Sequence, residues 1–264
     1  MLSKKGTFPL MVVLMVIIFS AVVPMVGAQS LKGMSLNGQT GLIGIPSGRI
    51  GWERSTDFGL DLGYHAILDD DTAHIPKASI SFLRFGEISF AYDTNRGEDN
   101  EDFIIGGKVQ LPTEGTAVAI GGTFQSIQIA GNTEAYQQLY VAATYPGTFF
   151  RMPAETTFVI GKTFGKDVSD DAIDFGMGFD LLLFPEVFQG YLHWINDFSN
   201  FSYSVDPVGA NAWYRGAFNT GVRLDLAANA NLSKYKFVID AMLTDALDAN
   251  RTFALGIAFG VPVN

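Results

Sequence analysis

The stretch DFGLDLGYH, residues 57–65, alternates polar or small side chains with apolar ones. Successive side chains of a β-strand point to opposite faces, so this stretch forms one apolar and one polar face as a strand. The same two-residue period recurs almost without interruption from Thr56 to Val261. A helical period is hard to find, and only residues 241–249 resemble a short helix. The pattern therefore predicts an all-β chain.

Twelve strands are expected along this period. Their ranges are 56–66, 77–84, 87–94, 102–111, 116–128, 135–145, 155–164, 172–183, 187–196, 213–226, 234–244 and 251–261. Most are longer than the roughly 5–6 residues typical of globular strands. About 9–11 tilted residues are what a strand needs to cross a bilayer. An even number of strands returns the chain to the side where it began.

The connections between these strands alternate in length. Short turns are expected at 85–86, 112–115, 185–186 and 229–233, and longer or more acidic links at 68–76, 95–101, 165–171 and 197–212. Residues 146–153 are an exception, a long connection on the short-turn side. Short turns on one side and longer loops on the other are typical of an outer-membrane barrel with periplasmic turns and periplasmic termini.

The apolar faces favour a membrane barrel over a soluble one. They carry four or five large apolar residues per strand, more than the interior of a closed barrel can pack, and no helices are available to cover them. A lipid bilayer covers such a surface, and a closed barrel leaves no free strand edge. The predicted fold is a transmembrane antiparallel up-and-down β-barrel of about 12 strands with a short N-terminal Gly/Pro leader. The alternative is a soluble β-sandwich or lipocalin-like protein.

The beginning of the chain predicts export. Residues 1–28 have two early lysines, an apolar run at 10–23 and small residues before Gln29, which is typical of a cleaved signal peptide. As an alternative, the run would be a membrane anchor, but it is shorter than the roughly 20 residues that a spanning helix needs. We expect residues 29–55 to form a leader that plugs or clips the periplasmic rim, residues 56–264 to form the barrel, and the protein to lie in the bacterial outer membrane.

Charge and composition exclude several function classes. The net charge of −10 disfavours nucleic acid, whose binding depends on Lys and Arg at its phosphates. The chain has no cysteine, so it forms neither disulfides nor thiolate metal sites. The expected partners are the lipid bilayer, lipopolysaccharide, the outer-membrane assembly machinery, and a polysaccharide or small solute.

The polar face carries charges of both signs and is expected to line a lumen. The lumen-lining candidates are Asp57, Asp61, His65, Lys108, Asp174, Asp180, His193, Arg215, Arg223, Asp225, Lys236 and Asp240. Charged rings set ion selectivity in pores, whereas paired charges can also simply fill a closed barrel. Twelve strands lie between the filled eight-stranded size and the open sixteen-stranded porins, so both alternatives stay open.

The stretch GQTGLIGIP, residues 38–46, differs from ordinary barrel strand because its glycines and proline impose a tight backbone path. It resembles the start of mature YjbH-like outer-membrane proteins, a family linked to exopolysaccharide production. The residues that carry the resemblance are Gly41, Leu42, Ile43 and Pro46. The chain departs from the family at Ser47 and Gly48, where Thr-Ala is usual, and it is much shorter than full-length members. The resemblance implies a barrel with this N-terminal motif and an accessory role in polysaccharide export.

Catalytic and metal-binding patterns are weak. Three histidines exist: His65 and His193 on the polar face, and His74 in the first acidic loop. No Gly-x-Ser-x-Gly or His-Glu-x-x-His motif is present. The acidic triplet 69–71 is better explained as solvated loop charge than as a calcium site, because no ligand spacing follows it. We expect no enzyme activity, no cofactor and no metal. The predicted function is a narrow, porin-like channel for small or extended solutes, and the alternative is a structural or accessory protein linked to exopolysaccharide.

Overall fold

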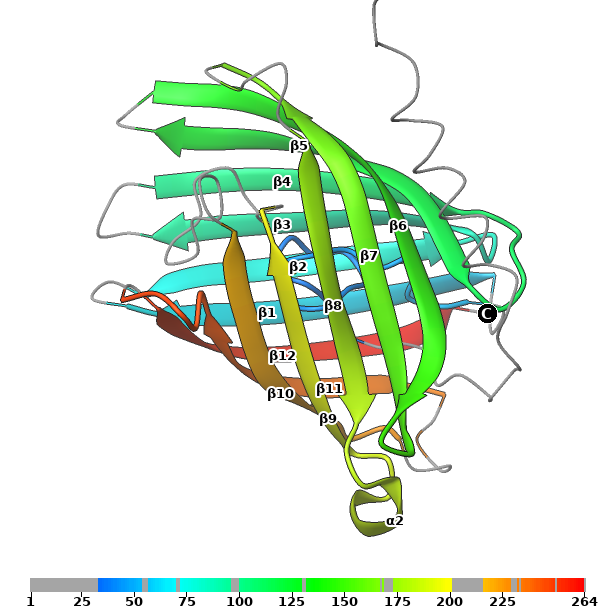
Figure 1. Cartoon of the computed structure of the whole chain (residues 1–264). Coiled ribbons are helices and arrows are strands. Elements are labelled where there is room, and N and C mark those ends of the chain that lie inside the picture. The colour runs from blue at the N-terminus through cyan, green and yellow to red at the C-terminus, as the bar shows by residue number, and fades with distance from the viewer. Residues whose placement is uncertain are drawn as a thin grey trace, which may run out of the picture.

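The computed structural model describes residues 33–53, 57–69, 72–95, 100–129, 132–166, 168, 173–200, 216–228, 232, 234–249 and 251–263. In this part of the chain twelve antiparallel strands form a closed barrel, in which each strand pairs with the next and β1 pairs with β12 (Figure 1). The strands are β1 (Phe58–Leu68), β2 (Ala73–Phe82), β3 (Gly86–Asn95), β4 (Asn100–Gln110), β5 (Ala117–Ile129), β6 (Asn132–Phe149), β7 (Met152–Phe164), β8 (Asp174–Leu182), β9 (Leu192–Ser199), β10 (Ala217–Asp225), β11 (Lys236–Thr244) and β12 (Thr252–Val263). The twelve-stranded transmembrane barrel predicted from the sequence is confirmed.

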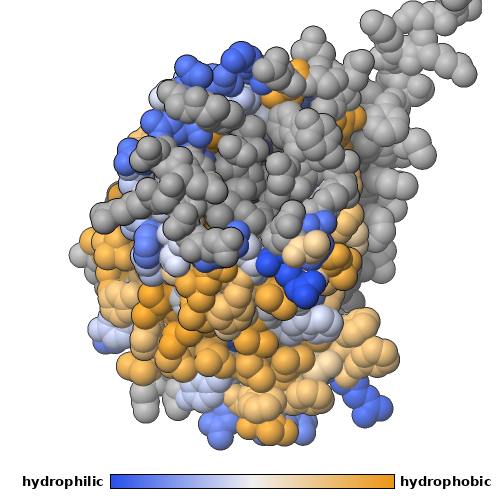
Figure 2. Space-filling view, turned by 90° about the vertical axis from the view of Figure 1, so that its left-hand side faces the viewer, coloured by the Kyte–Doolittle hydropathy of each residue, from blue (hydrophilic) through white to orange (hydrophobic). Residues whose placement is uncertain are grey.

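The outside of the barrel is apolar and the inside is mostly polar or small. In β12 the side chains of Phe253, Leu255 and Ile257 are 40–44% exposed, whereas Thr252 and Ala254 are buried. Hydrophobic side chains cover much of the lower half of the face seen in Figure 2. A closed barrel pairs its backbone groups between strands, so such an apolar outside is stable in lipid.

We expect Leu255→Arg to destabilise the barrel by roughly 2–4 kcal/mol, the cost of a cation on the lipid face near the bilayer midplane. Thr252→Arg is the matched control, because Thr252 lies on the opposite face of the same strand. Equilibrium unfolding from lipid vesicles measures both. A Thr252→Arg loss as large as that of Leu255→Arg would contradict the facing of β12.

The connection at 146–153, which the sequence predicts to be long, is a tight two-residue turn. Strand β6 continues to Phe149, β7 begins at Met152, and Phe150 and Arg151 between them have φ of 48° and 70°. Pro146 and Pro153 are tolerated inside these strands because each pairs there with one neighbour only. Pairing of β6 with β5 stops at Thr144, and pairing of β7 with β8 starts at Ala154.

Three other boundaries differ from the sequence prediction. Strand β2 begins at Ala73, so His74 lies in a strand and not in the acidic loop. Strand β9 begins at Leu192, because Pro185 suits the first turn of a helix and starts the short helix α2 (Pro185–Phe188). The helix-like stretch 241–249 continues as strand to Thr244. None of the helices in the described part of the chain is long and apolar enough to cross a membrane.

Residues 33–53, called the inner segment from here on, run inside the barrel (Figure 1). Apart from the bridges Met34–Thr40 and Gly41–Pro46 the segment has no regular strand. Its residues from Gly33 to Trp52 are buried. It thus lies deeper than the rim position predicted for a leader, because wall residues along the length of the strands hold it. The predicted signal peptide, residues 1–28, lies outside the described residues.

Candidate functional site

The inner face of the barrel gathers most of the lumen-lining candidates. Buried there are Asp61, His65, Lys108, Asp174, Asp180, His193, Arg223, Asp225, Lys236 and Asp240. Asp57 instead precedes β1, where the strand alternation has not started; its side chain is 67% exposed and pairs with Arg84. Arg215 lies outside the described residues.

The inner face also carries buried charged residues that the sequence patterns do not single out. Lys77, Asp102 and Glu155 stand at the first position of an expected strand, and Asp197 stands just after one. All four are buried in the barrel. A strand boundary off by a few residues removes such side chains from the alternation, and boundaries are the least reliable part of sequence interpretation. The correct strand bounds, with the same period, include all four.

The charged groups buried in the described residues are unequal in number. The eleven carboxylates are Asp61, Glu87, Asp93, Asp102, Glu155, Asp174, Asp180, Asp197, Asp225, Asp240 and Asp245. The five cationic groups, other than histidine, are Arg49, Lys77, Lys108, Arg223 and Lys236.

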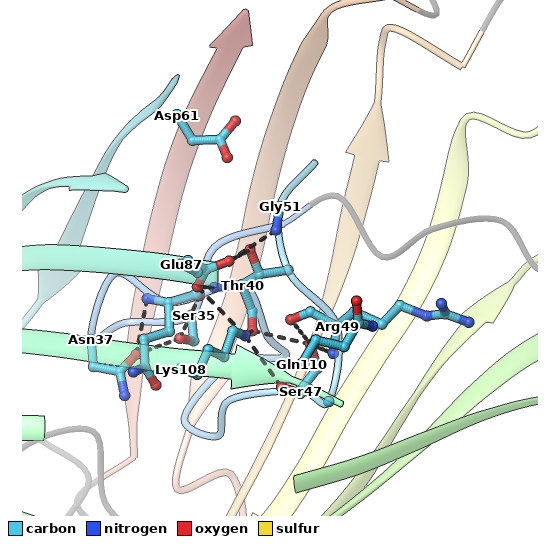
Figure 3. A network of polar contacts seen from close by, with 12 residues as sticks. Ser35, Asn37, Thr40, Ser47, Arg49, Gly51, Asp61, Glu87, Lys108 and Gln110 are labelled. Atoms are coloured by element: carbon cyan, nitrogen blue, oxygen red, sulfur yellow. Dashed lines mark hydrogen bonds and ion pairs between the residues drawn. The ribbon is translucent and has the colours of Figure 1, made fainter. Parts of the chain in front are cut away.

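Glu87 and Lys108 form one anchor of the inner segment (Figure 3). The Glu87 carboxylate accepts hydrogen bonds from the backbone N–H of Thr40 at 2.8 Å, the Thr40 hydroxyl at 2.6 Å and the N–H of Gly51 at 2.9 Å. Lys108 Nζ donates to the carbonyl oxygens of Thr40 at 2.6 Å and Ser47 at 3.2 Å. Lys108 Nζ also lies 3.5 Å from Glu87 Oε1. Side chains of two strands, β3 and β4, thus bind backbone groups of the segment, among them the N–H groups of Thr40 and Gly51.

Asp197 of β9 forms a second anchor on another part of the wall. Its Oδ2 accepts the backbone N–H groups of Ile43 and Gly44, both at 2.8 Å. Its Oδ1 accepts the side-chain amide of Asn219 at 2.7 Å. These bonds fix the Gly-rich turn at Ile43 and Gly44 against the wall.

Three cations bind the segment from β2, β10 and β11. Arg223 forms two hydrogen bonds with Asp240, at 2.8 and 3.1 Å, and its Nη1 donates to the carbonyl oxygen of Gly41 at 3.2 Å. Lys77 donates to the carbonyl oxygens at 35 and 36. Lys236 donates to Asp61 at 2.8 Å and lies 4.6 Å from the Trp52 ring, whose Nε1–H also donates to Asp61. The segment is therefore held from several sides of the barrel.

Apolar contacts complete the fit. Leu42 and Ile45 form a buried cluster with Tyr140, Ala142 and Val159 of β6 and β7. A second cluster joins the segment to inner residues of seven strands: Leu36, Ile43, Ile67, Ala73, Ile75, Ala91, Ile104, Ile195, Met242 and Ala254. Part of the inner face is thus apolar, which the alternation alone does not predict. The motif residues Gly41, Leu42, Ile43 and Pro46 all lie in the lumen.

We expect Gly48→Ala to loosen the inner segment. A Cβ at this position would lie 2.1 Å from the carbonyl oxygen of Ala117 and 3.0 Å from that of Ala142, both backbone atoms of the wall. Overpacking costs typically about 1–3 kcal/mol, which corresponds to about fivefold to 150-fold in a local opening equilibrium. Hydrogen exchange of the amides at 40–51 measures this opening. Gly147→Ala is the matched control, since its Cβ meets nothing closer than 3.8 Å; equal exchange in the two variants would contradict the prediction.

In the described part of the chain the three histidines contact two carboxylates and a tyrosine. His193 Nδ1 lies 2.6 Å from Asp180, and His65 Nε2 lies 3.4 Å from Asp240, inside the network that also holds Arg223. His74 contacts Tyr64 on the outer side. No group of three or more metal-ligating side chains is found among the described residues.

No protein-family model and no curated protein matches the chain. Solved structures do match. A KdgM porin is 7% identical with a TM-score of 0.51, and the match covers 77% of this chain and 99% of that chain. The KdgM porin in complex with disordered oligogalacturonate gives the same values. The outer membrane protein Omp33 of Acinetobacter baumannii is 14% identical with a TM-score of 0.44, and the match covers 79% and 98% of the two chains. The likeness to the KdgM porin is one of fold.

Proposed function

We propose that the protein is a porin-like channel of the bacterial outer membrane whose lumen is restricted by its own inner segment. The apolar outside suits a lipid bilayer, and the inside presents charged and polar groups to whatever occupies the lumen. The shared fold with the KdgM porin supports the same class of protein. The solutes that pass are small or extended, because a folded chain already occupies the lumen.

The observation that carries this proposal is that the inner segment fills the centre of the barrel. The wall facing the segment carries small residues: a Cβ on Gly176 would lie 3.0 Å from the Ile45 side chain, and one on Gly178 would lie 2.6 Å from that of Leu42. Small barrels without a channel are filled by side chains of their own wall. Here the side chains of the wall leave the lumen open, and the inner segment, a separate stretch of the chain, occupies it.

That stretch is held by hydrogen bonds, ion pairs and packing, since the chain has no cysteine to link it covalently. Its anchors are Glu87, Asp197 and Arg223 on β3, β9 and β10. Interactions of this kind open and close locally at a free-energy cost below that of unfolding the whole barrel. A passage restricted by the segment is therefore adjustable without breaking the wall.

Planar-bilayer recordings of the purified protein test the proposal. We expect discrete current steps from the wild type, and larger or more frequent steps from the double variant Glu87→Ala, Asp197→Ala, which removes two anchors of the segment. Heat-modifiable migration on a gel checks that both barrels are folded. A silent bilayer from both folded proteins would refute a channel and leave the structural or exopolysaccharide role. The YjbH-like resemblance of residues 38–48 itself stays a prediction, because none of the comparisons bears on that family.

A further inference from the structure

The buried charges of the barrel are distributed unevenly along its axis. We call the end where β1 begins and β12 ends the terminal end, and the other the opposite end. Five of the eleven buried carboxylates lie at the opposite end: Asp93 near the end of β3, Asp102 near the start of β4, Asp174 at the start of β8, Asp197 near the end of β9, and Asp245 directly after β11. None of the five buried cationic groups in the described residues stands at that end of a strand.

The cations lie elsewhere and are occupied. Lys108 and Arg223 are near the terminal ends of β4 and β10, Lys236 is the first residue of β11, and Arg49 binds Glu155 near the start of β7. Each of these four pairs with a carboxylate. Lys77, within β2, donates to two backbone carbonyl oxygens of the inner segment and also interacts electrostatically with Asp240 and Asp93. The five buried cationic groups are thus paired with nearby carboxylates or hydrogen-bonded to the inner segment.

Asp174 and Asp197, two of the opposite-end carboxylates, accept hydrogen bonds from neutral donors, and Asp174 also interacts electrostatically with Lys162. Asp174 accepts the Thr163 hydroxyl at 2.6 Å, and Asp197 accepts two backbone N–H groups and an amide. Asp93 and Asp102 are direct register partners across β3 and β4. Like charges placed opposite each other repel, and each acid has a further partner: the backbone N–H of Gln128 donates to Asp102 at 3.1 Å, and Lys77 interacts electrostatically with Asp93.

We propose that the channel selects cationic over anionic solutes, and that the carboxylates of the opposite end set this preference. This inference rests on the proposed function. Rings of acidic side chains attract cations into a pore and repel anions. Residues of the barrel wall, and not of the inner segment, determine this preference. Loss of the inner segment removes Arg49, a cation, and leaves every carboxylate of the opposite end in place. An anionic oligosaccharide, such as the oligogalacturonate present in one KdgM porin structure, is therefore disfavoured as a solute here.

Reversal potentials in a KCl gradient across a planar bilayer test the inference. We expect a reversal potential whose sign and size correspond to a several-fold preference for K⁺ over Cl⁻. We expect this both in the full chain and after deletion of residues 33–53. The triple variant Asp93→Asn, Asp102→Asn, Asp174→Asn should move the potential most of the way toward zero. Asp57→Asn is the matched control, because Asp57 is an exposed acid outside the lumen.

The outcomes separate the two proposals. Current steps with no preference or with a Cl⁻ preference would overturn the inference while the channel function stands. A K⁺ preference that the triple variant leaves unchanged, or that Asp57→Asn reduces equally, would overturn the assignment to the opposite end. A silent bilayer from both the full chain and the deletion would overturn the channel function and this inference with it.

Discussion

Deletion of residues 33–53 is expected to raise the single-channel conductance of the folded barrel several-fold. The segment is buried from Gly33 to Trp52 and contacts the wall on several sides, so its removal empties the part of the lumen that it fills. Conductance grows with the open cross-section of a pore, and twelve strands enclose more space than their own side chains need. Planar-bilayer recording of the deletion beside the full chain measures the change.

The deletion needs a control for barrel folding, because it exposes wall charges that the segment now satisfies. Heat-modifiable migration and strand content by circular dichroism report whether the twelve strands still close. Gly48→Ala, which keeps every residue of the segment but disturbs its approach to Ala117, should give a smaller increase in the same direction. A folded deletion variant with the conductance of the full chain would show that the segment does not limit passage.

Arg223→Met is expected to destabilise the barrel by about 3–5 kcal/mol, the usual loss when one partner of a buried ion pair is removed. Arg223 and Asp240 are both fully buried and joined by two hydrogen bonds, and Arg223 also binds the carbonyl oxygen of Gly41. The variant leaves the Asp240 carboxylate in the lumen without its main counter-charge. Equilibrium denaturant unfolding from lipid vesicles measures the loss.

Arg84→Met is the matched control for this change. Arg84 also pairs with an aspartate, Asp57, but both side chains are more than half exposed. Exposed ion pairs contribute about 0–1 kcal/mol, so this variant should lie close to the wild type. The double variant Arg223→Met, Asp240→Leu should recover part of the loss, because it leaves no buried charge behind. Equal losses of unfolding free energy for Arg223→Met and Arg84→Met would contradict this prediction. They would mean that the ion pair in the lumen is as well hydrated as the exposed pair.

The barrel itself follows from the sequence because one physical signal, the two-residue period, acts along the whole chain. Each strand of the type seen in residues 57–65 has to place its apolar side chains in lipid and its polar ones inside. Strand ends are harder to predict from the sequence, because a single side chain at a boundary does not extend the two-residue period. Lys77, Glu155 and Asp197 are inner-face residues that the expected strand limits leave at or beyond an end.

The position of the inner segment could not be predicted in the same way. Its glycines and Pro46 indicate a special backbone path, yet they carry no period that would show which surface it meets. Its partners Glu87, Asp197 and Arg223 are 36 to 182 residues away along the chain, and only the closed barrel brings them to it. The apolar cluster around Ile43 has the same origin, since the segment shields part of the wall from water.

The pairing of β1 with β12 has a consequence for biogenesis. These two strands are the first and last of the barrel, so their seam joins residues about as far apart in the chain as the fold allows. Contacts of such long sequence separation form late, because the entropy of closing a long loop opposes them. The inner segment directly precedes β1 and hydrogen-bonds to the early strand β3 and to the late strands β9 and β10. Its contacts therefore link strands from both ends of the sheet, the two ends that the β1–β12 seam has to bring together.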